Sequence, residues 1–408
     1  MNPLYVGIDV SSKTNVVYLM KPDGSKISNF SVANSLDGSK KLVRNILSAL
    51  DKHSLSEVII GLEATSVYGE NLVYFLREDG SFAEYLTKIH VLNPKQVKKF
   101  KDSYNDLPKN DFVDSFVIAD CLRFGRINKA VYLDDYRYVA LKTLTRARFY
   151  AVQNLVKEKQ RLINVIFKKY SSLTQDKIFS DKYGAAACAI YTEFDSVDSL
   201  VNMDLNDLTE FIRKKGKNRF ADPDSVAKAL QKAARSSYRL PKTVNDSVNQ
   251  VLSISINSIR AIEAQIKALE KAIADQMDLI PNTLQSIPGV GPVYAAGIIA
   301  EIGDINRFNS QAALAKYAGL AWKQHQSGDF ESENTHLIHT GNRFLKYYLC
   351  EAAFSLVRCD TEYNRFYHLK YNEVNKFQHK RALALTARKF VRLVFRLLKD
   401  NRLYISKS

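Results

Sequence analysis

Four acidic residues in the first third of the chain could together hold divalent metal ions. Asp9 lies in an otherwise apolar stretch, and Glu63 ends a second apolar stretch at 59–63. Asp111 and Asp114 are three residues apart, so a helix would place both on one face. A magnesium-dependent phosphodiester site needs three or four carboxylates from separate elements, because hard oxygen ligands must converge around ions about 3.5–4 Å apart. These residue types therefore predict metal-assisted phosphodiester chemistry.

Each acid also has a purely structural interpretation. Asp9 could be a structural carboxylate, although an unpaired buried carboxylate is costly. Glu63 could be a helix N-terminal acid. Asp111 with Asp114 could form an N-cap and a solvated face. Asp120, nine residues after Asp111, would turn to the opposite side of a helix, so we exclude it from the set.

The elements that must position these acids follow the order βββαβαβα. Three stretches rich in β-branched and aromatic residues come first, and a Lys21-Pro22-Asp23-Gly24 turn precedes the third, which predicts an antiparallel meander. In ribonuclease-H-like folds this order brings the first strand, the fourth strand and the last helix together, which favours the metal site over four unrelated structural roles. The expected strands are 4–10, 14–20, 27–33, 58–62 and 88–92, and the expected helices are about 39–51, 68–78 and 111–124.

The composition changes between about 145 and 280, where Gly and Pro become scarce and helix formers dominate. Ten positions spaced alternately by four and three, eight of them apolar, predict a long helix that pairs with another helix. The partner could be 145–170 of the same chain or a helix of another subunit. Pro281 ends this heptad seam, whose members are Val248, Leu252, Ser255, Ile259, Ile262, Ile266, Leu269, Ile273, Gln276 and Ile280.

A glycine turn opens the C-terminal region. The stretch 286–292 precedes an Ala-rich helix that extends to Ile302, the pattern of a helix-hairpin-helix. Gly289 and Gly291 could expose backbone N–H groups to a phosphate at a helix N-terminus. They could equally serve only to turn the chain.

A basic amphipathic helix is predicted at 376–402. Arg388, Arg392 and Arg396 recur at helical spacing, beside an apolar face. This stripe could be a solvated face, or it could contact the phosphates of a nucleic acid.

The length of 408 residues allows two to three domains. We expect an α/β catalytic domain at 1–143, a helical coiled-coil region at 144–281 and a mainly helical domain at 282–408. The formal net charge of +16, from 59 Lys and Arg against 43 Asp and Glu, predicts a partner with dense negative charge. Nucleic acid is the first expectation and an anionic membrane surface the second.

Composition excludes several classes of protein. The apolar share of 46% and the charged share of 25% exclude a wholly disordered or collagen-like chain. The four cysteines are far apart and form no CxxC pair, which argues against a disulfide framework or a structural zinc site. The N-terminus lacks the pattern of a signal peptide, and no run of about 18 apolar residues occurs. We therefore expect a cytoplasmic protein that does not enter a membrane.

Several motifs at both ends of the chain resemble one family. In the N-terminal region they are Tyr5 to Lys13, Gly61 to Glu70, Val91 to Phe100 and Lys109 to Asp114. In the C-terminal region they are Ser286 to Gly291, Phe308, Tyr317 to Leu320, Gln326 to Gly328, and Gly341-Asn342-Arg343 through Glu351 to Ala353. Together they resemble the DEDD transposases of the insertion-sequence one-hundred-ten family, which are relatives of the Piv-type invertases.

The resemblance implies a RuvC-like, ribonuclease-H-like N-terminal domain in which Asp9, Glu63, Asp111 and Asp114 bind two Mg²⁺ ions. It also implies that Ser327, in the C-terminal domain, attacks a DNA phosphate and forms a covalent phosphoserine intermediate. A free serine hydroxyl is a weak nucleophile, so metal assistance is needed. Without the resemblance, the residues around Ser327 indicate only a loop.

Further expectations also come from the family. Its members are guided by a bridge RNA that pairs with donor and target DNA, and they assemble as tetramers, so we expect DNA, RNA and a dimer to tetramer of this chain. Arg343, in a family motif, is a further candidate for contacting nucleic acid, and the nucleoid is the expected location. The chain departs from the family pattern at two places: Phe112-Val113 stand where an Arg is frequent, and Trp322 stands where Pro is common.

Three functions remain open at this point. The first is a recombinase that cuts and rejoins DNA through Ser327. The second is a RuvC-like junction nuclease in which water attacks the phosphate and Ser327 is incidental. The third is a non-catalytic nucleic-acid-binding scaffold, against which the four intact acids speak.

Overall fold

The computed structural model describes residues 2–64, 67–104, 107–108, 110–125, 136–175, 177–322, 326–327, 330–331, 337–338 and 340–406. The chain forms two compact units, Met1–Leu133 and Asp134–Ser408. Each unit contains its own buried hydrophobic clusters. Among the described helices, none is both long enough and apolar enough to span a membrane.

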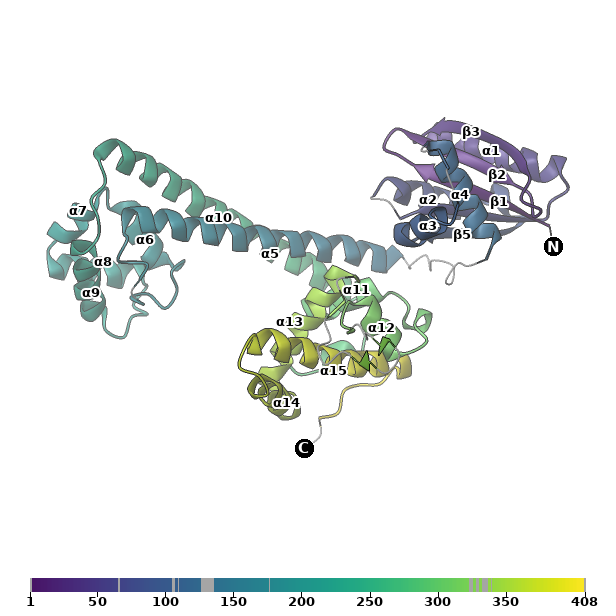
Figure 1. Cartoon of the computed structure of the whole chain (residues 1–408). Helices are drawn as coiled ribbons and strands as arrows, with labels where there is room; N and C mark the ends of the chain where they lie inside the picture. The colour runs from purple at the N-terminus through teal and green to yellow at the C-terminus, as the bar shows by residue number, and fades with distance from the viewer. Residues whose placement is uncertain are drawn as a thin grey trace. The chain divides into compact units, whose positions relative to one another are not determined.

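A five-stranded mixed sheet forms the centre of the first unit (Figure 1). The spatial order is β3-β2-β1-β4-β5; β1, β2 and β3 are antiparallel neighbours, whereas β4 is parallel to β1 and β5 is parallel to β4. This arrangement confirms the expected α/β architecture of the N-terminal region. The strands are β1 (Pro3–Val10), β2 (Thr14–Met20), β3 (Lys26–Ala33), β4 (Glu57–Glu63) and β5 (Leu86–Leu92).

Helices pack on both faces of this sheet. Leu4, Val6 and Ile8 of β1 form one face, which α1 and α2 cover. The alternate residues of β1, including Tyr5 and Gly7, form the other face, which α4 covers. The helices are α1 (Leu36–Lys52), α2 (Glu70–Glu78), α3 (Pro94–Lys101) and α4 (Asp111–Arg123), with 3-10 turns at Val67–Gly69 and Gly80–Phe82. Helix α3 is an addition to the expected order.

The second unit begins with a helical region. Two long helices, α5 and α10, run side by side and are connected by four shorter helices (Figure 1). The shorter helices pack around one end of the long pair in a common hydrophobic cluster. The helices are α5 (Tyr136–Lys169), α6 (Ala185–Glu193), α7 (Val197–Asn202), α8 (Leu205–Lys215), α9 (Pro223–Arg235) and α10 (Lys242–Met277).

The heptad seam of α10 faces α5 of the same chain. Arg148 pairs with Glu270 at 2.7 Å and Lys159 pairs with Glu263 at 2.8 Å. The paired residues advance from 148 to 159 along α5 but go back from 270 to 263 along α10, so the two helices are antiparallel. In the structure, α10 thus packs against α5, one of the two partners that the sequence allows. The buried members of the seam are Val248, Leu252, Ser255, Ile259, Ile266, Ile273 and Ile280.

The C-terminal part of the second unit is mainly helical. Its hydrophobic cluster is built from α11, α12, α13 and α15 and includes Leu141 of α5, so the long helix is anchored in this core. The elements are the 3-10 turns Leu284–Ser286 and Ile305–Arg307, helices α11 (Pro292–Ile302), α12 (Gln311–Tyr317), α13 (Arg343–Cys359), α14 (Thr361–Asn372) and α15 (Gln378–Asp400), and the short strands β6 (Gln326–Ser327) and β7 (Phe330–Glu331).

Candidate active site

The register of the sheet brings Asp9 and Glu63 to the same edge. β1 and β4 are adjacent and parallel with Ile8 opposite Leu62, so Asp9 and Glu63 follow at the same end of the two strands. Side chains alternate between the two faces of a sheet, so both acids lie on the face that α4 covers.

Two glycines let α4 approach this face closely. Gly7 of β1 is opposite Gly61 of β4 at the centre of the sheet. A Cβ atom at Gly7 would lie 2.1 Å from the carbonyl oxygen of Ser115, and one at Gly61 would lie 2.8 Å from the Leu122 side chain. Position 7 cannot hold a side chain unless the helix backbone moves. The absence of a side chain at Gly7 therefore sets the distance between α4 and the sheet.

The first turn of α4 carries the other two acids. Asn110 caps the helix, because its side-chain oxygen accepts a hydrogen bond from the Val113 N–H at 2.8 Å. Asp111 and Asp114 follow on one face of the helix. One carboxylate oxygen from each of Asp9, Asp111 and Asp114 lies within 4.8 Å of the others. The strand edge and the helix N-terminus thus bring together three of the four predicted acids in a single cluster.

The electrostatics of this acidic cluster are those of crowded negative charge. Burial, followed by repulsion from Asp114 and Asp111, raises the pKa of Asp9 to about 6. Burial, followed by repulsion from Asp9 and Asp114, also raises the pKa of Glu63. Glu63 lies outside the tight group of three but is electrostatically coupled to it.

Lys101, the last residue of α3, supplies the positive charge nearest this cluster in the described part of the chain. Its Nζ atom lies 2.5 Å from Oδ1 of Asp114, and both side chains are partly exposed. The same ammonium group lowers the pKa of both Asp9 and Glu63, against the larger effect of burial. Sequence reasoning missed Lys101, because α3 was not predicted. It also missed Gly7 and Gly61, although glycine within an apolar strand is a known sign of close backbone approach.

The donor set suits a hard divalent cation. Carboxylate oxygens are the ligands that Mg²⁺ prefers, and three of them lie close enough to share one ion. Burial, and then repulsion from Asp114 and Asp111, makes the charged form of Asp9 unfavourable without a cation, as its raised pKa indicates. A bound cation would remove this repulsion, so Asp9, Asp111 and Asp114, with Glu63 beside them, fit a metal site.

Ser327 belongs to the other unit of the chain. It lies in β6, and its backbone is opposite Phe330 of β7 in a two-stranded ribbon. The neighbouring Gly328 lies outside the described residues.

The two glycines of the turn before α11 have different surroundings. Gly289 has φ +80°, and a Cβ atom there would lie 3.0 Å from Cys359 Sγ and Ser355 Oγ, so the turn itself requires glycine. Gly291 is the N-cap of α11, and a Cβ atom there would meet nothing within 4 Å. Gly291 therefore lies at an open helix N-terminus, whereas the surroundings of Gly289 account for it structurally.

The predicted basic stripe is present on α15. Arg392 and Arg396 are exposed, and Arg396 has only a loose ion pair with Asp400 at 3.6 Å. Burial, followed by the nearby charge of Arg392, lowers the pKa of Arg388. Nη1 of Arg388 is buried and has no hydrogen-bond partner among the described residues. Two arginines in such proximity favour an anion that would neutralise both.

Arg343, the first residue of α13, lies over an aromatic surface. Its guanidinium is 4.8 Å from the ring centre of Phe344 and 5.4 Å from that of Tyr150, and it donates a hydrogen bond to the Tyr150 hydroxyl. The Arg343 side chain is exposed. A planar cation on an aromatic support is suited to contacts with phosphates and bases.

Comparison with known proteins assigns the chain to a family. A model of the DEDD transposase domain of IS110 matches residues 6–170, and a model described as transposase IS116/IS110/IS902 family matches residues 282–368. The chain belongs to the IS110/IS116 family of transposases. The first matched range contains the four acids and the second contains Ser327.

Relatives resemble the chain over nearly its full length. The uncharacterized 44.8 kDa protein of insertion element IS116 from Streptomyces clavuligerus is 24% identical, covering 98% of this chain and 96% of the relative. The uncharacterized 43.6 kDa protein of IS110 from Streptomyces coelicolor is 26% identical, covering 99% and 96%. The mini-circle putative transposase for IS117, also from Streptomyces coelicolor, is 24% identical, covering 84% and 80%.

Family membership establishes the general activity of the chain. As an IS110/IS116 transposase it is an enzyme that cleaves and rejoins DNA. The DEDD transposase domain implies the use of a divalent metal, and the cluster of Asp9, Asp111 and Asp114 is a group of acids that could hold one.

Proposed function

We propose that this transposase cuts and rejoins donor and target DNA through a covalent phosphoserine at Ser327, with Mg²⁺ held by Asp9, Glu63, Asp111 and Asp114. The observation that carries the proposal is the acidic cluster, in which three carboxylate oxygens from two elements lie within 4.8 Å of one another. Burial, followed by repulsion from Asp114 and Asp111, raises the pKa of Asp9 there to about 6. Two ions are expected, because four carboxylates offer enough oxygen ligands for a two-metal site.

Ser327, the four acids and Lys101 have different roles in the proposed reaction. The Ser327 oxygen loses its proton to water and forms a new bond to the phosphorus of a DNA phosphodiester. The bond from phosphorus to one deoxyribose oxygen breaks, and that oxygen takes up a proton and leaves as a DNA hydroxyl. The phosphoserine keeps the energy of the broken bond, so a DNA hydroxyl can later attack it and release the serine. When bound, Mg²⁺ supplies Lewis-acid activation of the attacking hydroxyl and neutralises charge at phosphorus. The four acids position the Mg²⁺ charge, and the ion pair with Lys101 positions the Asp114 carboxylate.

The first unit is proposed to be RuvC-like, with a ribonuclease-H-like fold. The order β3-β2-β1-β4-β5, with a meander followed by two parallel strands, supports this. The antiparallel pair of α5 and α10 is proposed to form a coiled coil, which the alternating spacing of its buried residues supports. The proposed domains remain 1–143, 144–281 and 282–408.

Nucleic acids are the proposed partners of the basic surfaces. Arg343, Arg388, Arg392 and Arg396 are proposed to contact phosphates, together with the backbone at Gly289 and Gly291. The exposed arginines of α15 and the net charge of +16 support this assignment. A bridge RNA that selects donor and target, an assembly of two to four chains, and action at the nucleoid complete the proposal and follow the family resemblance.

Trapping of a protein–DNA adduct on a denaturing gel tests the proposal. Purified protein, Mg²⁺ and labelled element-junction and target DNA are incubated with and without RNA transcribed from the element's flanks. Ser327→Ala should abolish the adduct, and Ser253→Ala, which changes an exposed serine of α10, should not. Asp9→Ala should remove cleavage altogether, which separates an enzyme from a binding scaffold.

The alternative is a metal-dependent RuvC-like junction nuclease that acts by hydrolysis. The acidic cluster alone is compatible with it, because water can replace the serine as the nucleophile. Cleavage without an adduct that persists in Ser327→Ala would establish this alternative and refute the serine mechanism.

A further inference from the structure

The described residues that flank the Ser327 segment on its two sides meet at Gly319 and Gly341. Gly319, after α12, has φ +72°, and Gly341, before α13, has φ +137°. A Cβ atom at Gly341 would lie 2.5 Å from the backbone nitrogen of Gly319, so both glycines are needed for this contact. Beyond it, the Ile338 N–H donates to the carbonyl of Ala321 at 2.9 Å.

Trp322 forms an isolated antiparallel bridge with Leu337 one step further along this stem. We use the name stem for the paired residues 319–322, 337–338 and 340–341. Ser327 lies between the two halves of the stem, in β6. The direction of the stem therefore controls where the serine-bearing segment begins and ends.

Asn342 forms hydrogen bonds at the base of the stem through its backbone N–H and both polar atoms of its side chain. Its N–H donates to the carbonyl of Tyr317 at 2.7 Å, and its Oδ1 accepts from the N–H groups of Phe344 and Leu345, both at 3.0 Å. These last two bonds cap α13 and fix which side of the amide faces the helix. Its Nδ2 is therefore directed away from the helix, and it donates to Oε2 of Glu301 at 2.7 Å.

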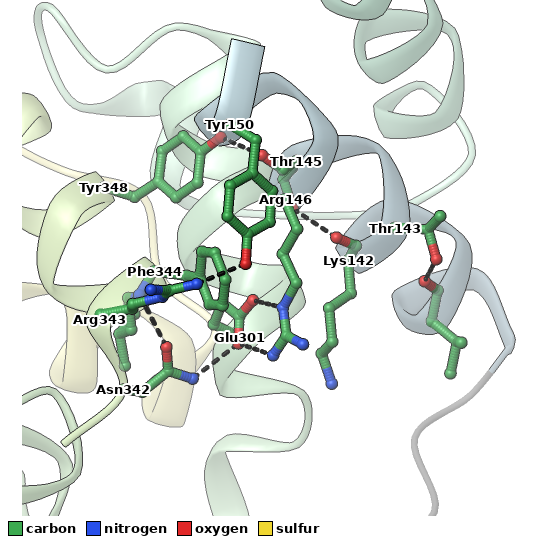
Figure 2. A network of polar contacts seen from close by, with 12 residues as sticks. Lys142, Thr143, Thr145, Arg146, Tyr150, Glu301, Asn342, Arg343, Phe344 and Tyr348 are labelled. Atoms are coloured by element: carbon green, nitrogen blue, oxygen red, sulfur yellow. Dashed lines mark hydrogen bonds and ion pairs between the residues drawn. The ribbon is translucent and has the colours of Figure 1, made fainter. Parts of the chain in front are cut away.

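Glu301 connects this base to α5. Its side chain is 1% exposed, and Arg146 of α5 donates to both of its carboxylate oxygens, from Nε at 2.7 Å and from Nη2 at 2.9 Å. Figure 2 shows Arg146 and Asn342 converging on the carboxylate from two different elements. A buried carboxylate in a bidentate pair has little freedom to move, because each alternative position loses a charged hydrogen bond.

We infer that Glu301, Arg146 and Asn342 are positioning residues that fix the stem and thereby aim the serine-bearing segment. The inference rests on the proposed role of Ser327 as nucleophile. Three elements distant in sequence, α5, α11 and the start of α13, meet in this group, which we call the clamp. Among the described residues, the clamp meets the stem at its base, through Asn342, so it acts through the geometry of the stem.

Glu301→Gln breaks the clamp with minimal change in volume. A glutamine has one acceptor oxygen where Glu301 has two, so its NH₂ group must face a donor: Nε of Arg146 in one orientation, or Nη2 of Arg146 and Nδ2 of Asn342 in the other. Asn342→Ser is a second variant that retains an N-cap residue for α13 but has no donor that reaches Glu301. Glu270→Gln is the matched control, because it breaks the Arg148 ion pair to the same helix α5 without contacting the stem.

Trp322 gives a direct optical readout. It is the only tryptophan of the chain and it lies in the stem, so its fluorescence reports stem order in the full-length protein. In Glu301→Gln and Asn342→Ser we expect acrylamide to quench Trp322 more strongly than in wild type and in Glu270→Gln. With DNA saturating, the rate of phosphoserine adduct formation should fall about 10²-fold, since small misplacement of a nucleophile has that effect. DNA affinity should stay the same.

The outcomes separate this inference from the proposed function. Wild-type adduct rates in both clamp variants would overturn the inference, whether or not Trp322 quenching changes. If Ser327→Ala forms no adduct but both clamp variants form it at the wild-type rate, the inference about the clamp fails and the serine mechanism stands. If Ser327→Ala cleaves DNA like wild type, the serine mechanism fails, while increased Trp322 quenching in the clamp variants still supports the clamp's hold on the stem. If circular dichroism shows that Glu301→Gln is unfolded, Asn342→Ser decides.

Discussion

Replacing Asp9 by Asn tests whether the acidic cluster is a metal site, because the substitution should have opposite effects with and without metal. In metal-free protein the folded-state pKa of Asp9 is about 6, above the ordinary value of 3.8. The folded state therefore holds the Asp9 proton more tightly than the unfolded state. The stability that this proton contributes is fully present below pH 3.8 and is lost as the pH rises through about 6.

The size of the effect follows from the same two values. At pH 8 the shift from 3.8 to about 6 corresponds to about 3 kcal/mol of lost stability, at about 1.4 kcal/mol for each pKa unit. Asp9→Asn removes the charge, so in EDTA at pH 8 it should stabilise the first unit by about 2–3 kcal/mol. At pH 4 the two proteins should differ little. With Mg²⁺ at a hundred times its dissociation constant, wild type should gain about 2.7 kcal/mol that the variant does not gain.

Hydrogen exchange of the full-length protein measures this locally, in peptides from β1 and α4. The free energy of opening is compared at pH 4 and pH 8, with EDTA and with Mg²⁺, for wild type, Asp9→Asn and the control Asp37→Asn in the exposed first turn of α1. The reasoning is refuted if Asp9→Asn destabilises the metal-free protein at pH 8. It is equally refuted if Mg²⁺ protects β1 and α4 to the same extent in wild type and Asp9→Asn.

Three further predictions concern the surroundings of the cluster and the basic stripe. Gly7→Ala should push α4 from the sheet, cost about 1–3 kcal/mol and abolish Mg²⁺-dependent protection of α4, whereas Gly80→Ala, where a Cβ atom meets nothing within 4 Å, should be neutral in the same exchange experiment. Lys101→Met should raise the pKa of Asp9 and Glu63 further, so the pH midpoint of Mg²⁺ binding in thermal-shift titrations should move upward. The control Lys88→Met, which changes the partner of Glu57, should leave the midpoint unchanged. An unchanged midpoint in Lys101→Met would contradict this prediction. Arg392→Ala should lower the slope of log affinity for DNA or RNA against log salt by about one in filter binding, and an unchanged slope would make the stripe a solvated face.

The acidic cluster is predictable from the sequence because its two periodicities are local. Alternation along β1 and β4 places Asp9 and Glu63 on one face, and a spacing of three places Asp111 and Asp114 on one side of a helix. The order of elements supplies the rest, since adjacent parallel strands end at the same edge.

Other features could not be derived in this way. Helix α3 has eight residues and one buried apolar residue, Val97, so it lacks the periodicity that reveals a helix, and Lys101 at its end was missed with it. The partner of the α10 seam was undecidable, because a heptad pattern describes one helix and not its neighbour. The clamp joins Arg146, Glu301 and Asn342, which are 155 and 41 residues apart, and no local pattern connects such positions.

The surroundings of Asp9 explain its raised pKa. Asp111 and Asp114 lie in the first turn of α4, where the positive end of the helix dipole favours a negative charge, and Lys101 pairs with Asp114. Asp9 lies at the end of a strand, where burial first, and then repulsion from Asp114 and Asp111, raises its pKa. The glycine pair in the sheet enforces this proximity, because it brings α4 nearer to β1 than any other residue would allow. The fold thus keeps a crowded set of carboxylates whose repulsion a cation would relieve, and the proposed metal site predicts that metal binding is coupled to proton release at Asp9.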